Sequence, residues 1–346
     1  MVSHRYSLPV LQRVRSNQWA RISLLAVILG FCCYGLANEW PRVRPMLGEL
    51  HWYSVTASAV AAAAAAGCLM LAWRTLLADL GSPLPVLVAA RVTFVAQLGK
   101  YLPGAIWSFA AHVELGHEYQ VPRRRGAASL LMALAVAAGV GLLISAVTLP
   151  FAAPAAAHHY RFFLLAVPLI AVCLVPSVMH KLLNLALRVV RQEPLERPVS
   201  WRGLGIALAW TVLGWLLLGL QICFLLADVT HGGPRTWLLG LGAYTLAWTL
   251  ALLVVVAPNG IGAREVVLVA ALAPVLPASA ALAVALVARL VTTLSDLAWS
   301  TVGLALKRHA RSSESAALTS LAQPEAATAL AHQVGKHRKT PSSLVQ

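Results

Sequence analysis

The stretch "APNGIGARE", residues 257–265, places two charges beside helix-breaking residues in an otherwise apolar part of the chain. The helix breakers, which remove a backbone donor or relax the backbone, are Pro258, Gly260 and Gly262. Arg264 and Glu265 are adjacent, so on a helix they point about 100° apart and are expected to find separate partners. Each therefore needs a partner elsewhere in the fold or a polar ligand. The alternative is an ordinary cytoplasmic turn in which Glu265 favours the helix dipole.

A second break occurs in "QLGKYLPGAIW", residues 97–107, where Lys100 precedes Pro103 and Gly104. Proline and glycine end a helix there and leave backbone groups without helical partners. A membrane tolerates such backbone only inside protein or beside a water-filled cavity. Lys100, the N-terminus of the helix that begins near Gly104 and the further cation Arg91 are therefore expected to form a phosphate site. The alternative is that Lys100 only extends to the cytoplasmic headgroups.

The last apolar segment, "ALVARLVTTLSDLAW", carries four polar residues that share one helix face. They are spaced i, i+3, i+4 and i+7, and are Arg289, Thr292, Thr293 and Asp296. Two helical turns, about 10.5 Å, separate Arg289 from Asp296, so a direct ion pair between them is not expected. Charges inside a membrane usually face a partner or a cavity. The face is predicted to line a headgroup pathway, the alternative being a structural ion pair with Glu265 or Arg264.

The composition predicts that these residues belong to a membrane protein. Of the 346 residues, 59% are hydrophobic and 11% are charged, which is more apolar surface than a soluble domain can bury. The formal charge of +15 is spread between apolar runs, which argues against nucleic acid as a partner. The five cysteines lie within apolar runs and show no metal-ligand spacing. Enzyme motifs such as GxSxG and Walker A are absent from the sequence, so no catalytic site, metal or cofactor is expected.

The expected architecture is an all-α polytopic membrane helix bundle with about eight spans. The predicted spans are 22–37, 54–78, 126–149, 161–177, 204–227, 235–256, 263–276 and 278–306. A full span needs about 20 apolar residues, so 263–276 is short for one. Between the second and third spans, the half-helices 84–98 and 104–117 are predicted to re-enter the membrane from one side. The two breaks resemble each other, which points to a central binding site as in transporters with internal repeats, although the sequence shows no convincing wider repeat.

The distribution of basic residues predicts that both termini lie on the cytoplasmic side of the cell membrane. In that orientation, 22 of the 27 Lys and Arg residues fall in cytoplasmic segments, four fall outside and one lies within a span. Residues 1–21 are expected to form a cytoplasmic N-terminal segment, 22–306 the transmembrane domain and 307–346 a disordered cytoplasmic tail. The first span has, alternatively, the features of a cleaved signal peptide.

Both breaks and their surroundings resemble the lysylphosphatidylglycerol synthase transmembrane domain family, over about residues 20–306. The matching stretches are "LGKYLPGAIW" with "VPRRRGAASLLM", and "APNGIGAREVVLVAAL" with "VARLVTTLSDL". The family pattern runs roughly Y-[LI]-P-G and later P-G-G-[LI]-G-x-R-E. Asn259 replaces the usual first glycine, and Met132-Ala133 stand where many members carry a Glu-Arg pair.

Family members are flippase-like integral membrane proteins. The resemblance therefore implies a domain that moves or accommodates an anionic or aminoacylated lipid. In the multiple peptide resistance factor proteins this domain is fused to a soluble aminoacyltransferase, whose activity is not expected here because only a short tail follows the last span. Stand-alone members often accompany polyprenyl-lipid glycosylation systems, which keeps polyprenyl-linked lipids open as substrates.

The leading hypothesis is a protein that binds and translocates an anionic or aminoacylated phospholipid or a polyprenyl-linked lipid. Its headgroup site would comprise Lys100, Pro103, Gly104, Pro258, Gly260, Gly262, Arg264, Glu265, Arg289 and Asp296. The alternative is a non-transporting scaffold for a glycosyltransferase or lipid-modifying enzyme, in which these charges form internal ion pairs. A third hypothesis, a membrane-embedded transferase, would need a metal or a base near Glu114 or Asp296. The sequence carries no signal for an oligomeric state.

Overall fold

The computed structural model describes residues 44–45, 48, 50–101, 106–152, 167–168, 172, 174–189, 199–230, 233–253, 263–278 and 280–305. Every regular element among these residues is a helix, which confirms the predicted all-α bundle. The N-terminal segment 1–21, the predicted span 22–37, most of 161–177 and the tail 307–346 lie outside the described residues.

Four of the described helices are long and apolar enough to cross a membrane. They are α3 (Trp52–Asp79), α6 (Arg123–Ala152), α9 (Trp201–Val229) and the helix Ala280–Ala305, and they coincide with the predicted spans 54–78, 126–149, 204–227 and 278–306. The 28 residues of α3 extend about 42 Å, more than the ~30 Å of a hydrocarbon core. Trp52 and Trp201, both strongly exposed, begin α3 and α9, as expected for interfacial anchors.

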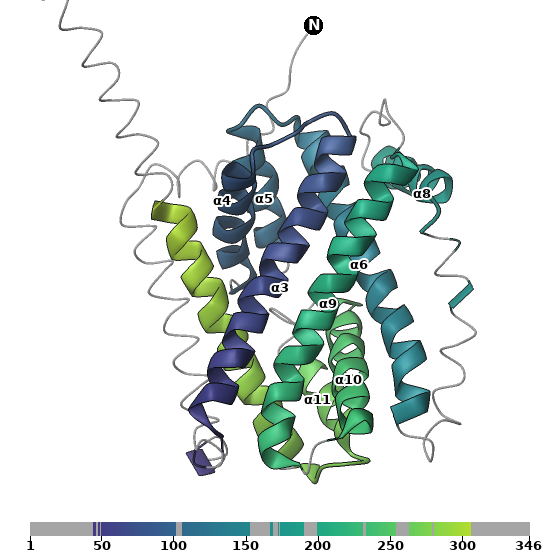
Figure 1. Cartoon of the computed structure of the whole chain (residues 1–346). Helices are drawn as coiled ribbons and strands as arrows, with labels where there is room; N and C mark the ends of the chain where they lie inside the picture. The colour runs from purple at the N-terminus through teal and green to yellow at the C-terminus, as the bar shows by residue number, and fades with distance from the viewer. Residues whose placement is uncertain are drawn as a thin grey trace, which may run out of the picture.

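Two shorter helices lie between α3 and α6. α4 (Val86–Gln97) and α5 (Ile106–His117) have 12 residues each, and the short 3-10 helix η1 (Leu98–Tyr101) follows α4 directly. These helices correspond to the predicted half-helices 84–98 and 104–117. At about 18 Å, neither can cross the hydrocarbon core alone. α4 and α5 contact each other at the upper end of the molecule (Figure 1).

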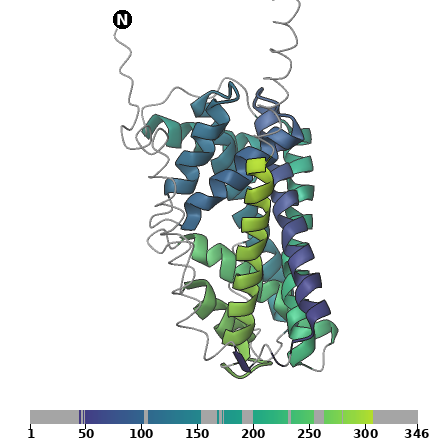
Figure 2. The ribbon, with the colours of Figure 1, turned by 90° about the vertical axis from the view of Figure 1, so that its left-hand side faces the viewer.

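A second pair of shorter helices follows α9. α10 (Pro234–Leu253) has 20 residues, and α11 (Ala263–Leu272) has 10. α11 is about 15 Å long, so the segment predicted as a span at 263–276 cannot cross the membrane by itself. α10 contacts α6, α9 and α11. In both views this pair occupies the lower half of the molecule, opposite α4 and α5 (Figures 1 and 2).

An amphipathic helix that the sequence interpretation did not anticipate, α8 (Pro176–Val189), begins inside the predicted span 161–177. Met179 is buried on its inner side, whereas Leu182 and Leu185 are 50% and 59% exposed. Figure 1 shows α8 at the upper end, beside the top of α9. A helix with leucines exposed on one side at the end of a membrane bundle is typical of the membrane interface.

α3 and α9 are antiparallel, and each supplies the acidic side chain that caps the other. Asp79, the last residue of α3, accepts hydrogen bonds from the backbone N–H (2.6 Å) and the hydroxyl (2.7 Å) of Ser200, the N-cap of α9. At the opposite end, Asp228 of α9 accepts from the backbone N–H of His51 (2.9 Å), the N-cap of α3, and from the hydroxyl of Ser54 (3.0 Å). Both carboxylates thus satisfy donors that a helix N-terminus leaves open.

The same helix ends reveal a wider internal repeat, which the sequence interpretation did not recognise. Trp52 followed by Leu76-Leu77-Ala78-Asp79 recurs, at the same spacing, as Trp201 followed by Leu225-Leu226-Ala227-Asp228. Each copy contains a long helix, two shorter helices and another long helix. The resemblance is confined to the helix ends because the apolar stretches between them tolerate many different residues of suitable volume.

The two copies have opposite orientations. Because α3 and α9 are antiparallel, α4 and α5 lie at the end where α3 finishes, and α10 and α11 lie at the end where α9 finishes (Figures 1 and 2). Inverted repeats of this kind occur in many transporters, where interrupted helices from the two copies form a site near the bilayer midplane.

A close contact with α6 fixes the position of α10. A Cβ placed on Gly242 would lie 2.3 Å from Oγ1 of Thr148, so only a residue without a side chain fits there without rearrangement. Beside it, the buried hydroxyls of Ser145 and Thr245 are hydrogen-bonded at 2.8 Å. Small residues and hydroxyl pairs hold helices together in lipid, where the hydrophobic effect between helices is absent. This contact positions Tyr244, which belongs to the candidate site.

Removal of either capping carboxylate is expected to weaken the α3–α9 contact. Asp79→Ala and Asp228→Ala should each lower the free energy of unfolding by about 1–3 kcal/mol, because each leaves hydrogen-bond donors at a helix N-terminus without their charged acceptor. Because the caps lie a helix length apart, the double variant should show the sum of the two losses to within about 0.5 kcal/mol. Chemical unfolding in detergent micelles measures these values. A double variant no less stable than the single variants would contradict two independent caps.

Candidate functional site

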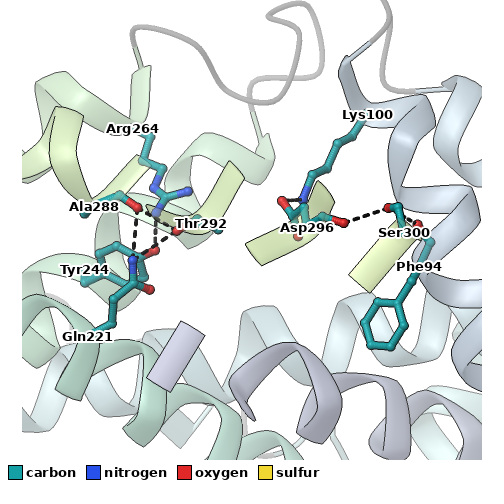
Figure 3. A network of polar contacts seen from close by, with 9 residues as sticks. All are labelled: Phe94, Lys100, Gln221, Tyr244, Arg264, Ala288, Thr292, Asp296 and Ser300. Carbon is teal, nitrogen blue, oxygen red and sulfur yellow. Dashed lines mark hydrogen bonds and ion pairs between the residues drawn. The ribbon is translucent and has the colours of Figure 1, made fainter. Parts of the chain in front are cut away.

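Lys100, from the break at 97–107, forms an ion pair with the helix Ala280–Ala305. Nζ of Lys100, in η1, lies 2.5 Å from Oδ2 of Asp296. The side chain of Asp296 is 6% exposed and that of Lys100 is 24% exposed (Figure 3). A short charge-assisted contact compensates both charges where little water reaches them.

Further contacts extend this docking by one helical turn. The hydroxyl of Ser300 donates to the carbonyl oxygen of Phe94 in α4 at 2.8 Å. The Phe94 ring stacks on Trp299, with ring centroids 4.5 Å apart. Figure 3 shows Asp296 and Ser300 on one helix, facing Lys100 and Phe94. α4 is therefore held against this helix at a level that places Lys100 beside Asp296.

The second pair of shorter helices is tied to the same helix. Nη1 of Arg289 donates to Oε1 of Glu265, in the first turn of α11, and their side chains are only 22% and 11% exposed. The structure thus contains the ion pair between Arg289 and Glu265 that was the alternative to a pathway lining. Arg289 and Asp296 are two turns, or about 10.5 Å, apart along the helix. As expected from that spacing, they pair with different residues.

Arg264 takes a partner different from that of Glu265, as expected for neighbours on a helix. Its guanidinium donates to the hydroxyl of Tyr244, and its Cζ lies 4.6 Å from the centroid of the Tyr244 ring. Tyr244 is buried in α10, whereas Arg264 is half-buried. Within the described part of the chain, Arg264 contacts no carboxylate. A neutral aromatic side chain therefore stabilises this cation through both its hydroxyl and its π face.

Gln221 of α9 is a site residue that the sequence interpretation missed. Its Nε2 donates to the carbonyl oxygen of Ala288 (3.0 Å) and to Oγ1 of Thr292 (3.1 Å), one residue before and three after Arg289. It is fully buried, and Figure 3 shows it reaching toward the last helix. A lone amide within a long apolar run was the available signal, because a buried polar side chain in a span needs a partner.

Gly99 is a second residue that the interpretation missed. A Cβ at this position would lie 2.8 Å from both Cα and N of Ser108, and 2.9 Å from the carbonyl carbon of Trp107. These are backbone atoms of α5, which cannot rotate away as a side chain can. Only glycine therefore fits between η1 and α5, directly beside Lys100. Its position next to a charge within a helix break was the available signal.

The helix breakers themselves lie outside the described residues, so their contacts are not part of the observed site. They are Pro103, Gly104, Pro258, Gly260 and Gly262. The charged residues that follow or precede them are all described, and each lies against another helix. Lys100 thus contacts Asp296, and Glu265 contacts Arg289. Asp296 and Arg289 both belong to the helix Ala280–Ala305, and Arg264 adjoins Glu265 in α11.

Arg91 does not join Lys100, although the sequence suggested it as a further cation of the same site. It contacts the turn that follows α5 instead, donating to the Tyr119 hydroxyl and lying 4.0 Å from a carboxylate oxygen of Glu118. Glu114 forms an exposed bidentate pair with Arg123 at 3.1 Å for both hydrogen bonds. In the described ranges, no three His, Cys, Asp or Glu side chains form a metal-binding group.

These observations define a class of protein: a helical membrane protein in which two inverted pairs of interrupted helices dock charged ends on one long helix. The chain belongs to the family of the lysylphosphatidylglycerol synthase TM region, whose sequence profile matches residues 18–300. This match confirms the resemblance carried by the two breaks and identifies a membrane protein related to lipids. A comparison with curated proteins gave no match.

Tyr244 is expected to stabilise Arg264 in two separable ways. Tyr244→Phe removes only the hydroxyl and should lower the free energy of unfolding by about 1–3 kcal/mol, as for a lost hydrogen bond to a charged group. Tyr244→Leu also removes the ring and should cost about 0.5–2 kcal/mol more. Chemical unfolding in micelles compares the two variants. Equal losses in both would show that the ring face contributes nothing to holding Arg264.

Proposed function

We propose that this protein binds a membrane lipid by its headgroup between the two pairs of interrupted helices and translocates it across the cell membrane. The observation that carries the proposal is the docking of both pairs, from opposite ends of the molecule, on one helix through buried ion pairs. In transporters with inverted repeats, interrupted helices commonly form the substrate site. Membership of a lipid-related family supports a lipid as the substrate.

In this proposal, both helix pairs re-enter the membrane, one from each side. The described residues at the end where α3 finishes include Arg74, Arg202 and the run Arg123–Arg125, whereas those at the other end include Arg44 and Arg235. The positive-inside rule favours the first end as cytoplasmic. The helix Ala280–Ala305 then finishes in the cytoplasm, and a single span before α3 would place the N-terminus there as well.

The ion pairs supply partners that a moving headgroup can exchange. A lipid phosphate can replace Asp296 beside Lys100, or Glu265 beside Arg289. Such an exchange keeps the buried cations compensated while the acyl chains remain in the surrounding lipid. The headgroup therefore passes from one helix pair to the other along the face of the helix that carries Arg289 and Asp296.

Translocation of a fluorescent phospholipid in proteoliposomes tests the proposal. Vesicles containing the protein and a trace of NBD-labelled phosphatidylglycerol are treated with dithionite, which quenches only the label in the outer leaflet. The double variant Arg289→Gln/Glu265→Gln removes both charges of this ion pair. It should slow translocation by about tenfold or more, since charge-assisted contacts of about 1.5–3 kcal/mol are lost.

The matched control is Arg202→Gln, which makes the same chemical change at an exposed position of α9. It should translocate at the wild-type rate. Circular dichroism and gel filtration verify that each variant remains folded. A folded Arg289→Gln/Glu265→Gln protein that translocates as fast as the wild type would contradict the proposed site.

The internal ion pairs also favour a second candidate function, a non-transporting scaffold for a glycosyltransferase or other lipid-modifying enzyme. In such a scaffold the pairs Lys100–Asp296 and Arg289–Glu265 only stabilise the fold. The two functions differ in one measurement on the wild-type protein. A scaffold predicts that dithionite quenching in its vesicles is no faster than in protein-free vesicles, whereas a translocating protein accelerates it.

A further inference from the structure

The charged side chains that the structure describes at the site do not sum to zero. The described cations are Lys100, Arg264 and Arg289, and the described carboxylates are Glu265 and Asp296. The residues of the two breaks that lie outside the described part, 102–105 and 254–262, contain no charged side chain. The described charged side chains of the site therefore sum to one net positive charge.

That excess charge resides on Arg264. Lys100 and Arg289 each contact a carboxylate, whereas the described contacts of Arg264 are the hydroxyl and ring of Tyr244. A phenol stabilises a cation but leaves its charge uncompensated. Within a membrane, an uncompensated charge is costly and favours an ionic partner. A guanidinium can bind the two free oxygens of a phosphate group bidentately.

A buried acceptor without a donor lies near Arg289 of the helix Ala280–Ala305. Oε1 of Gln221 is buried and has no hydrogen-bond partner among the described residues, although Nε2 of the same amide binds next to Arg289. Buried acceptors normally receive a hydrogen bond. A headgroup hydroxyl, such as that of glycerol or a sugar, is a donor of the required kind.

We infer that the site selects a phosphodiester lipid with one net negative charge and a hydroxylated headgroup, whose phosphate binds Arg264. This inference rests on the proposed function and specifies its substrate class. One negative charge neutralises the site. An aminoacylated headgroup with a net positive charge would leave two positive charges together, and a doubly charged phosphomonoester would leave an excess negative charge.

A panel of labelled lipids tests the inference on the wild-type protein. The probes share one NBD label and are phosphatidylglycerol, lysyl-phosphatidylglycerol, phosphatidic acid and a polyprenyl phosphoglucose. We expect at least one of the two singly charged phosphodiesters to be translocated about tenfold faster than lysyl-phosphatidylglycerol and phosphatidic acid. The comparison between phosphatidylglycerol and polyprenyl phosphoglucose identifies the source of the phosphodiester.

The outcomes separate this inference from the proposal on which it rests. Translocation of lysyl-phosphatidylglycerol as fast as either phosphodiester would overturn the charge selection while leaving translocation intact. Quenching no faster than in protein-free vesicles for all four probes would contradict the proposed function itself.

Variants at Arg264 test whether this side chain sets the selection. Arg264→Gln reduces the net charge of the site to zero and should reduce the rate for the preferred phosphodiester about tenfold relative to zwitterionic phosphatidylethanolamine. Arg264→Lys keeps the charge and should keep the preference for the phosphodiester. Arg202→Gln is the exposed control and should leave the preference unchanged. A folded Arg264→Gln protein with the wild-type preference, or a folded Arg264→Lys protein without it, would overturn the assignment to Arg264.

Discussion

Loss of the Asp296 carboxylate is expected to lower the free energy of unfolding by about 3–5 kcal/mol, the cost of removing one partner from a buried ion pair. The carboxylate is 6% exposed and lies 2.5 Å from Nζ of Lys100. In Asp296→Ala, the ammonium group remains near the middle of the bundle without the carboxylate that compensates it. Chemical unfolding of the purified protein in micelles measures the loss.

Two controls show whether the cost arises from the uncompensated charge. Lys100→Met combined with Asp296→Ala removes both charges and should recover most of the stability. Glu114→Ala breaks an ion pair with Arg123 whose side chains are 38% and 57% exposed, and should cost less than about 1 kcal/mol. An Asp296→Ala loss no larger than the Glu114→Ala loss would contradict a buried, structurally important pair.

Gly99→Ala is expected to abolish most translocation while costing about 1–3 kcal/mol of stability, as overpacking in a well-packed region does. The added Cβ would meet the backbone of Ser108 at 2.8 Å, so η1 and the start of α5 must separate. Lys100 follows Gly99 directly and would move away from Asp296. The dithionite assay and chemical unfolding measure the two effects on the same preparation.

Gly67→Ala is the matched control. Gly67 lies within α3, and an added Cβ meets no atom within 4 Å. Alanine is the better helix former by about 1 kcal/mol, so this variant should be slightly more stable and fully active. Gly99→Ala translocating as fast as Gly67→Ala would show that the close approach of η1 and α5 is not needed to place Lys100.

The positions of the helices could be predicted because lipid as the solvent makes whole segments apolar. The apolar runs of α3, α6, α9 and Ala280–Ala305 are long enough that their approximate limits are readable from composition, although Arg289 and Asp296 lie within the last of them. The two short helices around the break at 97–107 were also predicted, since proline and glycine such as Pro103 and Gly104 stop a helix. α8 was missed, although its one-sided apolar pattern was readable at helical spacing.

The pairing of charges could not be predicted from one sequence. Residues on different helices meet only after the chain has folded, and an arginine in a span has several chemically equivalent carboxylates to choose from. The spacing excluded a pair between Arg289 and Asp296. It did not decide whether this helix face lines a headgroup pathway or forms an ion pair with α11. The contact between Lys100 and Asp296 and the nearby packing of Phe94 against Trp299 both join residues far apart in the sequence, and no local pattern encodes either.

The inverted repeat escaped detection for a related reason. Its strongest signal is the pair of capping residues Asp79 and Asp228, each preceded by the same three residues. Their significance becomes clear only when each carboxylate is seen at the N-terminus of the other helix. A search for equal spacing between an interfacial tryptophan and an acidic residue at a helix end would have found the repeat.

Cross-linking in native membranes tests most directly the claim that both pairs of interrupted helices converge on one helix. In a background with all five native cysteines replaced, a short bifunctional thiol reagent is applied to two double variants, Lys100→Cys/Asp296→Cys and Glu265→Cys/Arg289→Cys. A protease then cleaves the chain between the two positions. The two fragments stay joined on a denaturing gel only where the cross-link has formed. We predict efficient cross-linking in both variants and little in the mismatched variant Lys100→Cys/Arg289→Cys. Failure of either matched variant to cross-link, while the mismatched one does, would contradict the convergence.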